Sequence, residues 1–185
     1  MGVARGVVRR RVAWYDESAR AKARAPNGNI FRGDADMLKH KLLHPEILEA
    51  LAGAGHNSRV LIADGNYPFS TALGCNARLV FLNLSPGVVS CGQALEAVVS
   101  AIPVQGAAVM SPATSGPYAM SEDPPVWSSF EKILAAAGCE LKLERMSISN
   151  FYAAAGGEDV ALTIATGDVQ WYSNILLSIG AVKPE

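Results

Sequence analysis

The stretch RVLIADGNYP, residues 59–68, joins a short apolar run to an abrupt end. Residues 59–64 are mostly branched apolar residues, which is typical of a strand that is buried on both faces. The run ends at Asp64, and Gly65 opens a segment rich in turn-forming residues. Loops that follow such strands line the binding crevices of α/β sheets. The stretch therefore predicts an α/β protein with a polar edge at this point.

Helical spacing of apolar residues predicts three helices around this strand. One begins at Pro45 and ends at Gly53, one follows the capping-box residue Ser90 and ends before Pro103, and one ends at Gly138. Further strands are expected over residues 79–84, 107–110, 139–146, 160–165 and 174–179. Helices and strands interleave without internal repeats. The pattern favours a single domain with a mixed sheet covered by helices on both faces, which is a three-layer α/β/α arrangement.

Charge divides the chain into two parts. The 185 residues carry a net charge of −1, so a basic surface for nucleic acid is not expected. Residues 1–36 hold eight basic and four acidic residues, whereas residues 37–185 hold eight basic and thirteen acidic residues. We expect residues 1–36 to be a flexible extension, or to result from an upstream start codon with Met37 as the true first residue. The functional domain is then residues 37–185, with no apolar run long enough for a membrane span.

The cysteines and histidines give little support to a disulfide framework or a metal site. Cys75, Cys91 and Cys139 are odd in number and widely spaced, which favours a reducing cytoplasm. His40 and His44 lie four residues apart, but no third ligand is near them in the sequence. We therefore predict no metal.

Candidate functional residues occur at three turns. His56 lies in a Gly-His-Asn turn, where it is either an ordinary surface histidine or a proton-exchanging group. Asp64 is either a turn former or a ligand residue. The segment QWYSN, residues 170–174, has the aromatic rings, hydroxyl and amide that suit a sugar, although it also fits a strand entrance. Arg145 interrupts an alternating strand as either an anion or sugar clamp or a surface charge.

Together these stretches resemble the family of fucose mutarotases and ribose pyranases, which share the RbsD-like fold. The resemblance covers about residues 39–182 and rests on five stretches. They are HPEIL with the later AGH at residues 44–56, ADGNYP at 63–68, PVW through AGC at 125–139, ER at 144–145, and ATGD through YSNILL at 165–177. The PVW stretch, residues 125–127, favours the fucose-type members.

The resemblance implies a role for each candidate. His56 is implied as the acid–base residue, and Asp64, Arg145, Tyr172 and Asn174 are implied as sugar-binding residues. Ser173, in the same closing signature, is also predicted to bind the sugar, and it stands where fucose-type members carry a glycine. Tyr152 is a further candidate only, because the segment after Arg145 is longer here, around residues 152–159, and its match to a family tyrosine stays open. The family also implies a homo-oligomer, either a ring or a decamer.

The implied reaction opens the sugar ring and recloses it on the other face, with no cofactor. His56 and Asp64 lie eight residues apart with a strand between them, and such a strand spans about 26 Å. A monosaccharide is much smaller. Either the chain folds sharply at residues 57–58, or His56 of one subunit meets Asp64 of another. Because the resemblance implies a homo-oligomer, we predict a site shared between subunits.

Three alternatives remain open on the sequence. A ribose pyranase would interconvert the pyranose and furanose rings of D-ribose. A non-catalytic sugar-binding protein would keep Asp64, Tyr172 and Asn174 but would not need His56. A structural oligomer would bind no sugar at all.

Overall fold

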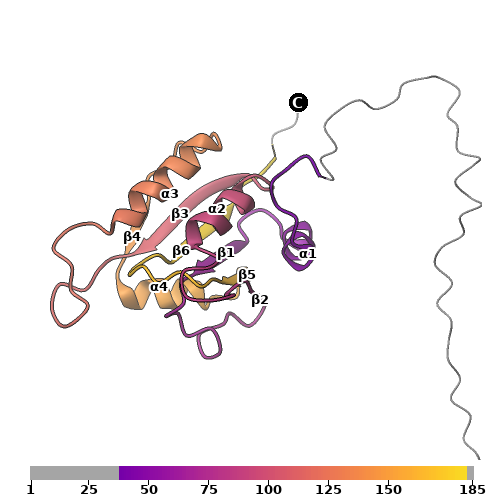
Figure 1. Ribbon diagram of the computed structural model, residues 1–185. Helices are drawn as coiled ribbons and strands as arrows, with labels where there is room; N and C mark the ends of the chain where they lie inside the picture. Colours follow the sequence, from indigo (N-terminus) through magenta and orange to yellow (C-terminus); the bar gives the residue numbers. More distant parts are fainter. Residues whose placement is uncertain (1–37, 183–185) are drawn as a thin grey trace, which may run out of the picture. The chain divides into compact units, whose positions relative to one another are not determined.

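The computed structural model describes residues 38–182, so the prediction for residues 1–36 lies outside the described part. It contains four helices and one six-stranded sheet (Figure 1). The helices are α1 (Pro45–Gly53), α2 (Cys91–Val99), α3 (Pro125–Ala136) and α4 (Ile148–Ala155). The strands are β1 (Arg59–Ala63), β2 (Arg78–Phe81), β3 (Val104–Met110), β4 (Glu144–Met146), β5 (Val160–Ala165) and β6 (Ile175–Ile179).

The sheet is mixed, as predicted, with the strand order β2-β5-β1-β6-β3-β4. Strands β1 and β2 both run parallel to β5, and β4 runs parallel to β3. Strand β6 lies between β1 and β3 and runs antiparallel to both. The start of β6 therefore meets the ends of β1 and β3 at one edge of the sheet.

Alternating residues of β1 enter two different apolar clusters. Val60 and Ile62 belong to the cluster that contains the buried faces of α1, α2 and α3. Leu61 and Ala63 belong to a second cluster, on the face covered by α4. All four side chains are fully buried, because a central strand has helices against both of its faces. Figure 1 shows α4 on the opposite side of the sheet from α2 and α3, so the predicted three layers are confirmed.

Local signals account for where the helices begin. Pro45 occupies the first turn of α1, where its missing N–H costs nothing. Ser90 and Gln93 form a reciprocal capping box at α2, with their backbone N–H groups bonded to each other's side chains. Ser147 caps α4 through the backbone N–H of Asn150.

Two predicted elements differ from the structure. The strand expected over residues 139–146 is confined to Glu144–Met146, because only this part pairs with β3. The strand expected over residues 79–84 ends at Phe81, and a tight turn containing Gly87 at φ +83° follows it. Helix α4 was not predicted, although Ser147 and the apolar residues Phe151 and Ala155 at i, i+4 spacing are its signals.

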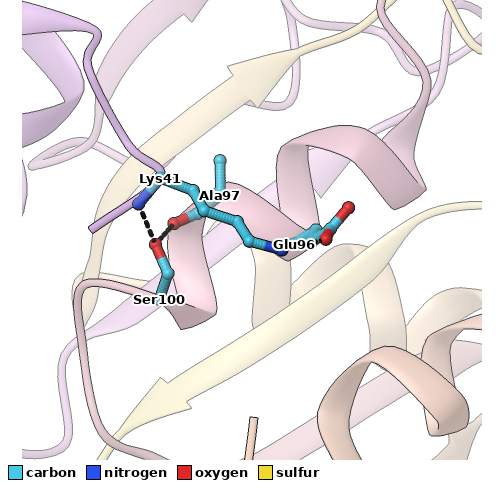
Figure 2. A network of polar contacts seen from close by, with 4 residues as sticks. All are labelled: Lys41, Glu96, Ala97 and Ser100. Carbon is cyan, nitrogen blue, oxygen red and sulfur yellow. Dashed lines mark hydrogen bonds and ion pairs between the residues drawn. The ribbon is translucent and has the colours of Figure 1, made fainter. Parts of the chain in front are cut away.

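The segment before α1 is tied to α2, as Figure 2 shows. The backbone N–H of Lys41 donates to Ser100 Oγ at 3.0 Å, and that hydroxyl donates to the Ala97 carbonyl at 2.7 Å. The Lys41 ammonium forms an ion pair with Glu96. Leu42, the next residue, is buried in the core. These contacts bring the start of the described chain onto the helical face that includes α2.

Candidate sugar-binding site

A cavity of about 400 Å³ lies at the sheet edge where β1 and β3 end and β6 begins. Its polar lining consists of one carboxyl and two amides, and most of the remaining lining is aromatic. The lining residues are Asp64, Asn66 and Asn174, the aromatic residues Tyr67, Tyr118, Tyr152, Trp171 and Tyr172, and the apolar residues Met110, Ala113 and Ile148. Aromatic faces that stack on a ring, together with a few polar groups that fix its orientation, suit a small polyhydroxylated ligand.

Asp64 is the acidic group of the cavity. It is 3% exposed, and its carboxylate accepts hydrogen bonds from Asn66 N at 2.9 Å and from Asn174 Nδ2 at 2.8 Å. The Asp64 N–H in turn donates to Asn174 Oδ1 at 2.9 Å. The pKa of Asp64 is raised to about 6, chiefly because burial disfavours the charged form. The charge of Asp168 adds to this rise, and the hydrogen bonds to the carboxylate partly oppose it. Such a group can both donate and accept a proton near neutral pH.

Asp168 organises the turn beside Asp64. It is buried, and its Oδ2 accepts from the N–H of Cys91, the first residue of α2, at 2.9 Å. This contact places a carboxylate at the positive end of a helix dipole. The Asp168 carbonyl accepts from Gly65 N at 2.8 Å, and a side chain at position 65 would approach that oxygen to 3.1 Å. The sequence motif contained Asp168, but its bond to α2 was not predicted because the partners are 77 residues apart.

Tyr172 lines the cavity and also holds the loop over residues 111–124. Its hydroxyl donates to the Tyr118 carbonyl at 2.6 Å and accepts from Ala113 N at 3.0 Å. The hydroxyl proton of Tyr172 is therefore already used, and its ring face and a remaining lone pair are what it offers to a ligand. Ser173 is fully buried and donates to the Gln170 carbonyl at 2.9 Å, so its hydroxyl shapes the turn rather than lining the cavity.

Arg145 lies outside this cavity. Its guanidinium forms two bonds to the Asp123 carboxylate, at 3.0 and 2.6 Å, and lies 5.3 Å from the centre of the Trp127 ring. These three residues line a second cavity of about 410 Å³. The bidentate pair and the cation–π contact satisfy the guanidinium without a ligand.

His56 lies at the other end of β1. It is exposed, and its Nε2 is 3.0 Å from Gln105 Oε1. His56 comes just before β1, whereas Asp64 comes just after it. Within one chain the strand therefore separates the predicted acid–base residue from the cavity.

Tyr152 joins the cavity from α4. Its ring stacks on that of Tyr67, with centroids 5.5 Å apart. Partial burial and the nearby charge of Asp64 raise the pKa of Tyr152. Because α4 was not predicted, the sequence analysis assigned Tyr152 to no helix or strand. In the structure, α4 brings Tyr152 into the same cavity as Asp64.

Two other kinds of site, a metal centre and a membrane-spanning helix, are absent from the described residues. Among residues 38–182, no three His, Cys, Asp or Glu side chains gather where they could hold a metal ion. Nor does any helix of this part combine the length and apolar character needed to cross a membrane.

Comparison with known proteins identifies the family. The model of the RbsD / FucU transport protein family matches residues 37–182. The chain belongs to this family. The resemblance drawn from the sequence motifs is thereby confirmed over the same part of the chain.

Curated relatives of this family member include fucose mutarotases from vertebrates. The human fucose mutarotase is 32% identical over 146 residues, which cover 76% of this chain and 90% of the human protein. The mouse fucose mutarotase is 31% identical, over 77% of this chain and 92% of the mouse protein.

Solved structures share the fold. A fucose mutarotase from Streptococcus pneumoniae in complex with L-fucose has a TM-score of 0.62 and 21% identity, covering 79% of this chain and 100% of that one. Bacillus subtilis RbsD complexed with D-ribose has a TM-score of 0.60 and 21% identity, covering 80% of this chain and 100% of that one. The predicted fold class is confirmed by these likenesses.

Proposed function

We propose that the protein is a mutarotase that interconverts the α and β anomers of L-fucose or a related sugar. The observation that carries the proposal is the buried Asp64 carboxyl, held by Asn66 and Asn174 in a cavity lined with aromatic rings. The vertebrate fucose mutarotases that this chain resembles at about a third identity support the same reaction.

Mutarotation requires proton transfers at two oxygens of the sugar. The anomeric hydroxyl loses a proton while the ring oxygen gains one, the ring opens to the aldehyde, and it recloses after rotation about the C1–C2 bond. Asp64 suits a proton-exchanging role because its pKa of about 6 leaves both protonation states accessible. General acid–base assistance contributes about 10²- to 10⁴-fold in rate. The bond between C1 and the ring oxygen breaks and re-forms with two proton transfers, and nothing is oxidised, reduced or transferred to another molecule, so we propose no cofactor.

The binding roles follow from what each residue presents to the cavity. We propose that Asn174 orients Asp64 and that Tyr172 offers a ring face to the sugar. Arg145 and Ser173, predicted as sugar contacts, support the site from outside the cavity: Arg145 through Trp127, and Ser173 through the turn it closes.

We propose that His56 acts in the cavity of a second copy of the chain, in a homo-oligomer. The support is its position at the far end of β1, exposed and held only by Gln105 among the described residues. In such an assembly each site takes Asp64 from one subunit and His56 from its neighbour. The protein is then fully active only as an oligomer.

The shared site can be tested by mixing two inactive variants. Asp64→Asn and His56→Ala are unfolded together and refolded at equal concentration. If the site is shared, about a quarter of the sites regain activity. Half of the sites receive an intact Asp64, half receive an intact His56, and about a quarter receive both. A mixture no more active than its components would contradict the shared site, as would a fully active monomer.

The function itself is tested by proton NMR saturation transfer between the anomers of L-fucose, and then of D-ribose. Faster anomer exchange of L-fucose with wild type, lost in Asp64→Asn, is the expected result. Pyranose–furanose exchange of D-ribose without an effect on L-fucose would instead identify a ribose pyranase. Sugar binding without exchange would identify a binding protein. If the wild type neither binds the sugar nor accelerates its exchange, the proposal is overturned.

We propose the cytoplasm as the location. Cys75, Cys91 and Cys139 are free thiols, which suits a reducing compartment. Subcellular fractionation tests this, and secretion of the protein would contradict it.

A further inference from the structure

The Tyr172 backbone has a conformation that non-glycine residues rarely adopt. Its φ is +59°, in the left-handed region. A tyrosine there is strained unless neighbouring groups hold it. The residue also lines the cavity and carries the two loop bonds of its hydroxyl. Whatever fixes the Tyr172 backbone therefore fixes the aromatic wall of the cavity and the loop above it.

The group that holds this backbone is the indole of Trp127. Its Nε1–H donates to the Tyr172 carbonyl at 3.1 Å, across 45 residues of sequence. Trp127 is 4% exposed and lies in the first turn of α3, so its ring has little freedom to move. It does not line the cavity itself. A single directional bond thus connects the rigid core to the strained residue of the site.

A second contact keeps the indole in place from its outer side. The Arg145 guanidinium lies over the Trp127 ring at 5.3 Å, and Asp123 holds that guanidinium with two bonds. Asp123 lies just before α3, and Arg145 lies on β4, so the contact connects the helix to the edge of the sheet. The indole is therefore fixed from both sides.

We propose that Trp127 is a positioning residue of the sugar site: its indole N–H holds Tyr172 in the left-handed conformation, and this places the Tyr172 ring and the loop at residues 111–124 over the cavity. Trp127 contacts no sugar and transfers no proton. This inference rests on the proposed function, since the affected step is the binding of the sugar.

The test is Trp127→Phe, which keeps a buried ring and removes the N–H. The matched control is Phe130→Leu, because Phe130 is fully buried one turn further along α3 and lines neither cavity. We expect Trp127→Phe to raise the Kd for L-fucose, measured by titration, about 5- to 10-fold, while the saturating exchange rate stays within about twofold of wild type. Phe130→Leu should lower the melting temperature and leave the Kd unchanged.

Equal Kd values for Trp127→Phe and wild type, or equal increases in both variants, would overturn the inference. Hydrogen exchange of the wild-type indole N–H groups tests it without any variant. Trp127 should exchange far more slowly than Trp171, whose side chain is half exposed. Equally fast exchange of the two indoles would overturn the inference.

The outcomes separate this inference from the proposed function. Wild type that binds L-fucose without exchanging its anomers would contradict the mutarotase and leave the Kd comparison of the variants valid. Wild type that does not bind L-fucose would overturn both. Normal turnover with an unchanged Kd in Trp127→Phe would overturn the positioning role alone.

Discussion

The two ends of β1 look alike in sequence and differ in structure. Each carries a polar residue next to a glycine, His56 at the start and Asp64 at the end. Asp64 is 3% exposed in an aromatic cavity, whereas His56 is exposed beside Gln105. The difference arises from neighbours distant in sequence, since only the end of β1 receives Asn174, which directly precedes β6, and Tyr152 from α4. Burial at this end of the strand is the main cause of the raised pKa of Asp64.

The largest expected effect comes from replacing the buried acid. Asp64→Asn keeps the size of the side chain and removes the exchangeable proton, so we expect a loss of about 10²- to 10⁴-fold in anomer exchange. Saturation transfer measures the rate, and circular dichroism confirms the fold. A variant with more than a tenth of wild-type activity would show that Asp64 is not the proton-exchanging group.

The next prediction concerns how the free energy of unfolding depends on pH. Asp64 stabilises the fold at low pH, whereas a salt-bridged acid stabilises it at high pH. The folded pKa of Asp64, about 6, lies above its ordinary value of 3.8. Folding therefore favours the protonated form, and this contribution is present below pH 3.8 and is lost as the pH rises through 6. The total is about 3 kcal/mol, from a shift of about two units at 1.36 kcal/mol each.

Urea unfolding of wild type and Asp64→Asn between pH 4 and pH 7 measures this contribution. The free energy of unfolding of wild type minus that of the variant should fall by most of this amount as the pH rises over this range. Other titrating groups cancel in the difference. A difference that is independent of pH would contradict the raised pKa.

A smaller effect is expected at the loop above the cavity. Tyr172→Phe removes the bonds to the Tyr118 carbonyl and the Ala113 N–H, each contributing about 0.5–1.5 kcal/mol, so the Kd for L-fucose should rise about 10-fold. Equal affinities of Tyr172→Phe and wild type would show that the loop closes without these bonds.

The smallest effect is expected at the other end of β1. Arg59 Nε lies 3.0 Å from Asp159 Oδ2, and both side chains are substantially exposed. Asp159→Asn should change the free energy of unfolding by less than about 1 kcal/mol, because solvent screens such pairs. Activity should remain unchanged. A strong loss of activity in this variant would show that the Arg59–Asp159 pair also supports the proposed shared site beside His56.

Part of the site could be predicted because its signals are local. Asp64 ends a buried apolar run, and Asn174 stands at the entrance of another, so both were identified before their contact was known. Helix α4 was missed because the segment after Arg145 was assigned to no element, although Ser147 and Phe151 carried the signals of a helix start. Without the helix, the stacking of Tyr152 on Tyr67 could not be foreseen.

The contacts of Arg145 and Trp127 could not be predicted for a different reason. Their partners Asp123 and Tyr172 are 22 and 45 residues away, and no periodicity relates such positions. The guanidinium could equally have faced a ligand, because its chemistry suits a sugar, an acid or an aromatic ring. The packing of α3 against the sheet determines which of these partners the Arg145 guanidinium contacts.

The sequence by itself determined the α/β class, the mixed sheet between helices, the starts of α1 and α2, and the family motifs. These depend on apolar period and on backbone capping, which act over a few residues. The tertiary structure decided that Asp64 is buried and His56 exposed, that Arg145 binds Asp123, and that Trp127 holds Tyr172. These contacts depend on how the strands and helices are arranged in space. That arrangement brings together groups that lie far apart in the sequence, where no local pattern indicates the contact.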